Sequence, residues 1–107
     1  MHKIDIKPLT VNQCWQGRRF KTKEYKRFER DLQFLLPKIE IPEGHLKLTI
    51  IWGFSNVQSD ADNPVKPFQD ILQKRYGFND SQIYELSIKK EIVKKGLEFI
   101  QFKVEAL

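Results

Sequence analysis

Hydrophobic and polar residues alternate most regularly over residues 46–54. One side of this extended segment carries the apolar residues Leu46, Leu48, Ile50, Trp52 and Phe54. Weaker alternation or short apolar runs at 3–10, 83–89 and 97–104 predict three further strands. The last two are predicted to pair as an antiparallel hairpin through the turn Lys94-Lys95-Gly96.

Two other segments have the period of an α-helix. The first begins after Thr22, a residue type favoured at the N-cap, and ends before Pro37; its apolar positions are Tyr25, Phe28, Leu32 and Leu35. The second is predicted over residues 65–76, with Gly77 after its last turn and a buried stripe of Val65, Phe68, Ile71 and Leu72. Asn63 is predicted to be its N-cap, ahead of Pro64 at the first helical position.

These elements predict the fold class. A chain of 107 residues with this organisation indicates one domain, residues 1–107. The order β-α-β-α-β-β favours an α/β protein of the α+β type, in which two helices pack on one face of a small mixed β-sheet.

The composition narrows the class of protein. A single cysteine, Cys14, excludes an internal disulfide framework. No apolar run approaches the roughly 18 residues of a membrane span, and the N-terminus has no signal-peptide character. We therefore expect a cytoplasmic protein without a membrane partner.

The net charge of +5 is concentrated near the N-terminus. Residues 1–36 carry nine Lys and Arg against four Asp and Glu, whereas residues 37–107 carry ten of each kind. Such a basic region suits a polyanion such as nucleic acid, although a surface that only confers solubility has the same composition.

The candidate chemistry lies between the central strand and the second helix. Asp60 and Asp62 point the same way in an extended chain, with Cα atoms about 7 Å apart. Asp80 can join them if the strand that starts near Ile83 pairs beside residues 46–54. Three carboxylates this close would repel one another, and an oxygen-preferring divalent cation relieves that repulsion. The three residues therefore predict a site for Mg²⁺, or for Mn²⁺ as a substitute.

A lysine accompanies these acids. Lys66 follows Asp62 by about one helical turn and is predicted to face the same rim, where its charge would stabilise a reacting phosphate. Asn63 would support the site from the helix start. Asp70 is interpreted as an ion-pair partner of Lys66 or Lys74 and not as a metal ligand.

Three other interpretations of the acids compete with a Mg²⁺ site. A restriction-type nuclease motif has its lysine two residues after an acid, whereas Lys66 comes four residues after Asp62. A calcium-binding loop starting at Asp60 is excluded, because its sixth position is Val65 instead of glycine and its twelfth is Ile71 instead of glutamate. A helix-capping loop with solvated acids is not excluded, since Asp and Asn are common at helix starts. The residues alone leave both a cation site and a capping loop open.

A known family has a similar pattern. The chain contains Asp60-x-Asp62-Asn63-x-x-Lys66-x-x-x-Asp70-x-Leu72, then Asp80-x-x-Ile83, and an earlier Val11-Asn12-x-x-Trp15. These segments resemble the RusA family of Holliday junction resolvases, common in bacteriophages and prophages. Three features depart from the family pattern. Asn79 stands where an acid often precedes Asp80, the stretch between Leu72 and Asp80 is about one residue shorter, and Pro67 removes a backbone donor from the first turns of the second helix.

The resemblance implies a Mg²⁺-dependent endonuclease that acts as a homodimer and resolves four-way DNA junctions by paired, symmetric nicks. By position, Asp60, Asp62 and Asp80 would bind the metal and Lys66 would be the catalytic lysine. A two-fold dimer suits this reaction, because one site per subunit can address two symmetry-related strands. The basic region would then hold backbone phosphates, with candidates Arg18, Arg19, Lys21, Lys23 and Arg27.

Two other functions fit the same residues. One is a non-catalytic nucleic-acid-binding protein whose acids only cap a helix. The other is a metal-dependent nuclease that acts on flaps, forks or RNA. The three acids together with Lys66 favour catalysis over binding alone.

Overall fold

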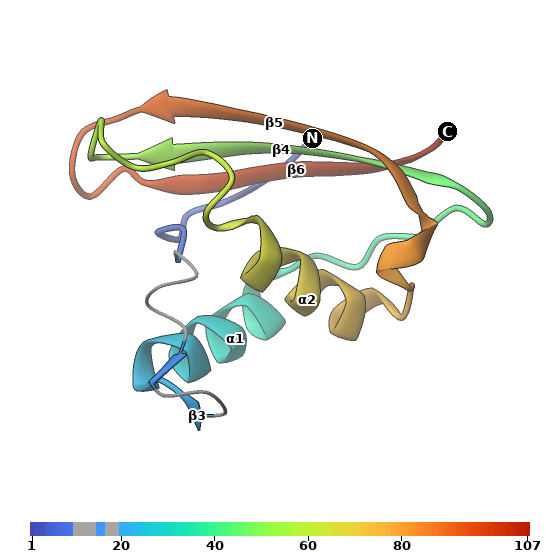
Figure 1. Cartoon of the computed structure of the whole chain (residues 1–107), viewed down its shortest axis with the longest axis horizontal. Helices are drawn as coiled ribbons and strands as arrows, with labels where there is room; N and C mark the ends of the chain where they lie inside the picture. The colour runs from blue at the N-terminus through green and yellow to red at the C-terminus, as the bar shows by residue number, and fades with distance from the viewer. Residues whose placement is uncertain (10–14, 17–19) are drawn as a thin grey trace.

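The computed structural model describes residues 1–9, 15–16 and 20–107 (Figure 1). In chain order its elements are β1 (His2–Ile4), β2 (Trp15–Gln16), β3 (Phe20–Lys21), α1 (Lys23–Leu35), β4 (Leu46–Phe54), α2 (Val65–Tyr76), the 3₁₀ turn η2 (Asp80–Gln82), β5 (Ile83–Ile92) and β6 (Phe99–Ala106). The two helices lie on one face of a four-stranded mixed sheet, which confirms the predicted fold class. β2 and β3 form a separate short antiparallel pair.

β4 occupies the interior of the main sheet, whose strand order is β1-β6-β4-β5. It pairs in parallel with β5 and antiparallel with β6, and β6 pairs with β1 on its other side. The predicted β5–β6 hairpin is therefore wrong, because β4 lies between these consecutive strands. The connection between them crosses the end of β4, where the Val93 amide donates to the Phe54 carbonyl at 2.7 Å.

The alternation within β4 explains its central place. Its predicted bounds are confirmed, and its apolar side chains are buried at every second position. With a β5–β6 hairpin, the second edge of the nine-residue β4 could be covered only by the three-residue β1 among the described strands of the main sheet. Placing β4 between them satisfies both of its backbone edges and buries its apolar face under the helices.

The first strand is shorter than predicted. Strand pairing covers only His2–Ile4, which face β6 residues 100–102. The Ile6 amide donates to the Ile4 carbonyl at 2.9 Å, so the chain turns directly after the strand. Pro8 lacks a backbone N–H and cannot extend the ladder. Position 10 of the predicted strand lies outside the described residues.

Helix α1 begins and ends close to its predicted limits. The Thr22 hydroxyl accepts a hydrogen bond from the Tyr25 amide at 3.1 Å, which confirms Thr22 as the N-cap. Tyr25, Phe28 and Leu32 are buried as predicted. Leu35 is 48% exposed, however, and Leu36 just beyond the helix takes its place in the core. The change of direction ahead of Pro37 accounts for this, since Leu36 is extended with φ −67° and ψ 128°.

Helix α2 differs from prediction at its start. Its N-cap is Pro64 in a right-handed helical conformation, and no side chain caps it, so the predicted Asn63 cap is wrong. The preceding residues form turns instead, with the Asn63 amide donating to the Asp60 carbonyl at 3.3 Å. The other end is as predicted: Gly77 takes φ 74°, a left-handed conformation that favours glycine.

The core lies between the helices and the sheet. Phe68 of α2 is fully buried and meets Trp52 of β4 and Phe102 of β6 edge to face, with ring centroids 5.5 and 5.6 Å apart. Such aromatic pairs add roughly 0.5–1.5 kcal/mol each beyond the area they bury. These contacts fix α2 against the C-terminal end of β4. Asp60 and Asp62 of the candidate site follow this end in the chain.

The opposite face of the sheet contains one close backbone approach. Gly53 of β4 is opposite Phe99 of β6, and a Cβ atom at Gly53 would overlap the Phe99 ring. The Lys3 ammonium lies 4.7 Å from the centroid of the same ring. Gly53 therefore permits an aromatic side chain to lie flat against the backbone of the central strand.

Gly53→Ala is expected to lower the free energy of unfolding by about 1–3 kcal/mol, because the added methyl group forces the Phe99 ring or the strand to move. Denaturant unfolding followed by circular dichroism measures this. In a Phe99→Ala background the same substitution should cost less than about 0.5 kcal/mol. An equal cost in both backgrounds would show that the ring is not the cause.

Candidate active site

Asp60 and Asp62 lie in the connection between β4 and α2. The peptide before each aspartate is anchored to the sheet through its carbonyl. The Trp52 indole N–H donates to the Ala61 carbonyl at 2.6 Å, and the Lys90 ammonium donates to the Ser59 carbonyl at 2.8 Å. The backbone of this acidic turn is therefore fixed at two points, one before each carboxylate.

The two carboxylates themselves point into solvent-accessible surroundings. Asp60 and Asp62 are exposed, and among the described residues neither side chain has a hydrogen-bond or ion-pair partner. Solvated acids on an anchored turn are available to a cation or to water. Their oxygen-only chemistry suits Mg²⁺ or Mn²⁺ better than a soft metal.

Lys66 lies at the start of α2 but binds acids other than these two. Its ammonium is 2.9 Å from an Asp70 carboxylate oxygen and 3.9 Å from an Asp80 oxygen. The pairing of Lys66 with Asp70 is as predicted. The hydrogen bond from Lys66 to Asp70 is the main cause of a raised Lys66 pKa, with a smaller contribution from the charge of Asp80. Lys66 is therefore fully charged at neutral pH.

The side chains of Asn79 and Gln73 fix the backbone around Asp80. Asn79 caps the 3₁₀ turn, accepting from the Ser81 amide at 3.0 Å, and the Asp80 amide donates to the Gln73 side chain at 3.0 Å. These bonds orient the turn against the C-terminal half of α2. Asn79 thus serves as a structural cap in this chain.

The three predicted metal ligands are not gathered into one group. Among the described residues, no three Asp, Glu, His or Cys side chains lie close enough to hold a metal ion. The pairing of β5 beside β4 is as expected, but it is parallel, with Ile83 opposite Leu46. Asp80 therefore precedes the start of this strand pair, whereas Asp60 and Asp62 follow the end of β4. The metal assignment stays a prediction.

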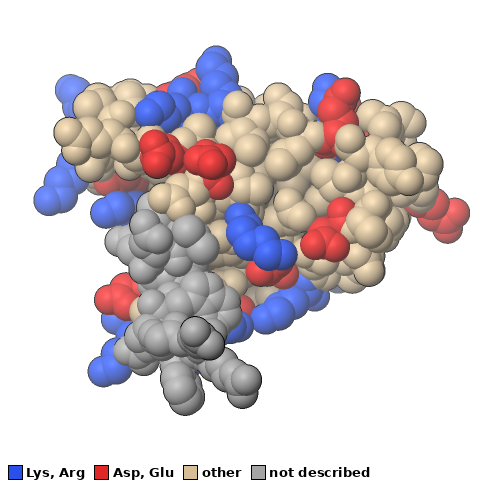
Figure 2. Space-filling view, viewed as in Figure 1, with Lys and Arg blue, Asp and Glu red and all other residues tan. Residues whose placement is uncertain are grey.

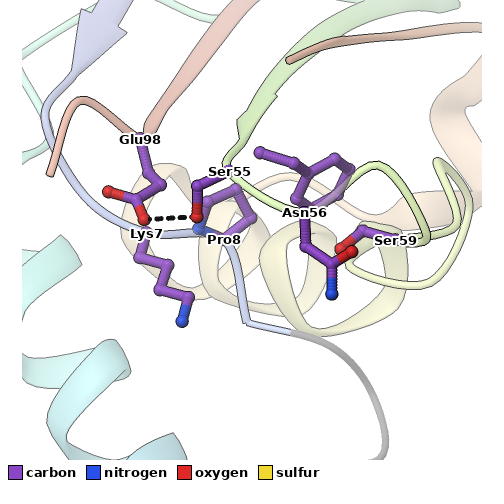
Figure 3. A pocket seen from close by; sticks show the side chains of 7 residues that line it. Lys7, Pro8, Ser55, Asn56, Ser59 and Glu98 are labelled. Carbon is purple, nitrogen blue, oxygen red and sulfur yellow. Dashed lines mark hydrogen bonds between the residues drawn. The ribbon is translucent and has the colours of Figure 1, made fainter. Parts of the chain in front are cut away.

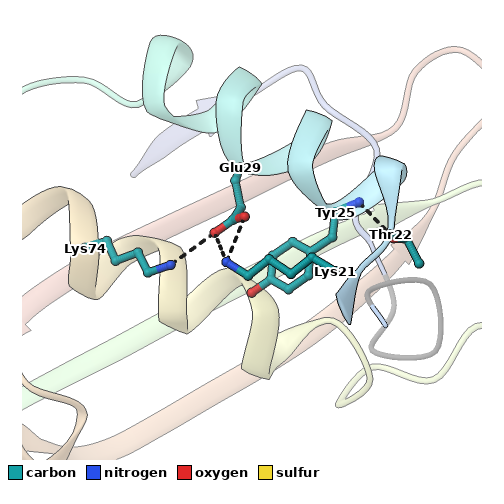
Figure 4. Close-up of polar contacts among 5 residues, drawn as sticks. All are labelled: Lys21, Thr22, Tyr25, Glu29 and Lys74. Carbon is teal, nitrogen blue, oxygen red and sulfur yellow. Dashed lines mark hydrogen bonds and ion pairs between the residues drawn. The ribbon is translucent and has the colours of Figure 1, made fainter. Parts of the chain in front are cut away.

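One predicted DNA-binding residue has a structural partner. Glu29 of α1 lies between Lys21 and Lys74, at 3.0 and 3.2 Å, and so links the segment before α1 to α2 (Figure 4). The hydrogen bond from Lys21 to Glu29 is the largest cause of a raised Lys21 pKa. The Lys21 ammonium is thus paired with Glu29 and is only partly available to bind a phosphate.

The other predicted DNA-binding residues differ in their surroundings. Lys23 and Arg27 are exposed on α1, whereas Arg18 and Arg19 lie outside the described residues. The face seen in Figure 2 shows acidic and basic side chains interspersed over the part of the chain that the structure describes. Neither α1 nor α2, the α-helices within that part, is long and apolar enough to cross a bilayer.

A cavity beside the acidic turn was not predicted from sequence. It has a volume of about 310 Å³ and is lined by Lys7, Pro8, Phe54, Ser55, Asn56, Ser59 and Glu98 (Figure 3). The Ser55 hydroxyl donates to Glu98 at 2.8 Å. The backbone amide of Glu98 itself, and then this hydroxyl, lower the pKa of the Glu98 carboxyl. Ser59 joins the cavity wall to the turn that bears Asp60.

Comparison with known proteins identifies the family. The model of the family described as Endodeoxyribonuclease RusA matches residues 7–101, which is most of the chain. The chain belongs to the RusA family. It is thus a member of a family of endodeoxyribonucleases that resolve Holliday junctions, and the predicted resemblance is confirmed. A search of curated proteins found no match.

The RusA match covers both halves of the candidate site. Residues 7–101 include the anchored acidic turn, the Lys66 group and Asp80. They also include Lys90, which contacts the acidic turn. Sequence patterns do not reveal this contact, because Lys90 and Ser59 are 31 residues apart.

Asp70→Asn is expected to lower the pKa of Lys66 more than Asp80→Asn does, because Asp70 supplies the hydrogen bond. A raised lysine pKa stabilises the fold at pH values below about 10.5, and the effect is lost as pH rises through the folded-state pKa. NMR titration of the Lys66 side chain measures both shifts. A larger effect from Asp80→Asn would contradict the geometry.

Proposed function

We propose that this RusA-family protein is a Mg²⁺-dependent, structure-selective endonuclease that resolves four-way DNA junctions by paired, symmetric nicks. The observation that carries the proposal is the pair of carboxylates, Asp60 and Asp62, which have no side-chain partner within the described part of the chain and lie on a turn whose backbone is anchored. A solvated acid in a loop that only caps a helix needs no such anchoring of its backbone. The Asn63 cap expected of a capping loop is absent.

The chemistry of the donor atoms fits the metal that the family implies, although among the described residues the three acids do not lie together. Asp60, Asp62 and Asp80 offer carboxylate oxygens only, and all three are exposed. When bound, the cation would activate a water molecule and neutralise charge on the scissile phosphate. Asp80 is engaged with Lys66 by a contact of 3.9 Å between side chains 45% and 65% exposed. An exposed pair of this kind contributes less than about 1 kcal/mol, so exchanging it for other partners is inexpensive.

Lys66 is proposed to act on the phosphate. Its raised pKa keeps the ammonium protonated, and its side chain is 65% exposed. A fixed positive charge at this position stabilises the negative charge that develops on the phosphate oxygens or on the leaving oxygen. Asp70, the closer of its two acidic partners at 2.9 Å, would hold the ammonium in place during that step.

The basic N-terminal region is proposed to bind the arms of the junction. Lys23 and Arg27 present unpaired charge on α1 among the described residues, and Arg18 and Arg19 would add to it from outside them. Contacts of this kind give affinity for the backbone without sequence choice. Lys21 would contribute less, because it shares Glu29 with Lys74.

A homodimer is part of the proposal, and β5 is the surface proposed for it. β5 is a ten-residue edge strand that pairs only with β4 among the described residues, and it exposes Leu86 and Ile92. An exposed strand edge is a template for pairing with a second strand. Antiparallel pairing of two copies about Ser87 sets Leu86 of one copy opposite Ile88 of the other. It also sets Glu85 opposite Lys89, so both apolar and charged positions match.

The function is tested with purified protein, a labelled four-way junction, a fork and a linear duplex, each with Mg²⁺ or EDTA. Paired symmetric nicks on the junction alone, dependent on Mg²⁺, are the expected result. Comparable cutting of the fork would favour a broader structure-selective nuclease. Binding of the junction without cutting would favour the non-catalytic alternative.

In the same assay, Asp62→Asn is expected to abolish cleavage and to leave junction binding unchanged, because it removes a ligand charge without changing the side-chain shape. Asp5→Asn is the matched control, an exposed acid elsewhere on the chain, and should cut like the unmodified protein. Near-normal cutting by Asp62→Asn would show that the metal assignment is wrong.

Leu86→Glu is expected to weaken dimerisation by at least about tenfold, because it places a charge opposite Ile88 of the second copy. Sedimentation equilibrium over a range of protein concentrations measures the dissociation constant. Leu97→Glu, at a side chain 63% exposed in the turn between β5 and β6, is the control. Dissociation by Leu97→Glu and not by Leu86→Glu would move the interface to that turn.

A further inference from the structure

Lys90 occupies an unusual position for a lysine on an edge strand. Its register partner on β4 is Trp52, so the two residues lie side by side on adjacent parallel strands. Both donate hydrogen bonds to the connection between β4 and α2. Trp52 reaches the Ala61 carbonyl, and Lys90 reaches the carbonyls of Val57 at 3.2 Å and Ser59 at 2.8 Å.

The carbonyls that accept two of these hydrogen bonds directly precede the proposed metal ligands in the chain. The carbonyl of Ser59 belongs to the peptide that precedes Asp60, and the carbonyl of Ala61 belongs to the peptide that precedes Asp62. Each aspartate therefore follows a peptide whose orientation is fixed by a side chain from the sheet. Within the turn, the Ser59 and Asn63 amides add bonds to the Asn56 and Asp60 carbonyls, at 3.2 and 3.3 Å.

The two anchors differ in how replaceable they are. Trp52 is fully buried, so it is required by the core whatever its indole N–H contacts. Lys90 is exposed, and the core does not need it. Its neighbour Lys89 provides a comparison, because it lies on the opposite face of β5 and approaches Glu91 at 3.9 Å.

We propose that Lys90 is a positioning residue for the metal site: it fixes the peptide before Asp60 and so directs that carboxylate toward a divalent cation. This inference rests on the proposed function. Lys90 acts through Asp60 and touches neither DNA nor the reacting phosphate. Its ammonium is already engaged by two carbonyls, which distinguishes it from a lysine that waits for a phosphate. Mutation of a residue that orients a metal ligand typically costs about 10–100-fold in metal affinity.

The test compares Lys90→Met, which keeps the aliphatic stem but has no donor, with Lys90→Arg, which keeps a donor, and with the control Lys89→Met. Hydrogen exchange of the peptide covering residues 55–63 is measured first, in metal-free protein. Lys90→Met should exchange about fivefold faster there, and Lys89→Met should not change, because Lys90 donates hydrogen bonds to this segment and Lys89 does not. Equal exchange in the two methionine variants would overturn the positioning role of Lys90.

Metal binding is measured next, by calorimetric titration with Mn²⁺, together with the Mg²⁺ concentration that half-activates junction cleavage. Lys90→Met should weaken both by about tenfold, Lys90→Arg should restore part of the loss, and junction affinity in EDTA should stay within about twofold. A loss of junction affinity at unchanged metal dependence would make Lys90 a phosphate contact and overturn the inference.

The two proposals fail in different ways. If the unmodified protein neither binds Mn²⁺ nor cuts the junction, the proposed function is wrong, and the role of Lys90 toward a metal ion falls with it. If the unmodified protein cuts the junction and Lys90→Met behaves like Lys89→Met, only the positioning role is wrong.

Discussion

The hydrogen bond from the Trp52 indole to the Ala61 carbonyl joins the core of this protein to its candidate site. Trp52 is fully buried between the sheet and α2, and a buried indole N–H without an acceptor would cost about 1–3 kcal/mol. The acceptor is the carbonyl between Asp60 and Asp62. The stability of the core and the course of the acidic turn therefore depend on the same side chain. This is why a solvated, polar turn can hold a defined backbone conformation.

The parallel pairing of β4 with β5 sets the layout of everything around that turn. It places Asp80 near the start of both strands and the Asp60–Asp62 turn after the end of β4. α2 runs between them, with Lys66 reaching Asp70 and Asp80. The acids are thus divided into one pair that has no partner among the described residues and a second group neutralised by lysine. The same pairing makes β5 an edge strand, which is the surface proposed for dimerisation.

Several lysines of the described residues have a structural partner. Lys21 and Lys74 converge on Glu29 and hold the segment before α1 against α2, while Lys66 is held by Asp70. Lys90 is engaged by backbone carbonyls. The total of 19 Lys and Arg residues therefore overstates the number of cationic side chains that are free to bind DNA. Predicting which lysines bind phosphate requires knowing which are already paired, and those pairings join positions far apart in sequence.

Local patterns determined the parts of this protein that depend on neighbouring residues. Alternation defined β4, the helical period and Thr22 defined α1, and the motif around Asp60 and Lys66 indicated the family, because each signal is confined to one segment. The tertiary structure decided which strands are neighbours. It separated β5 from β6, since satisfying both edges of β4 outweighs the short connection between them. It also decided that Lys90 and Trp52 anchor the acidic turn, because strand register alone brings these two residues side by side.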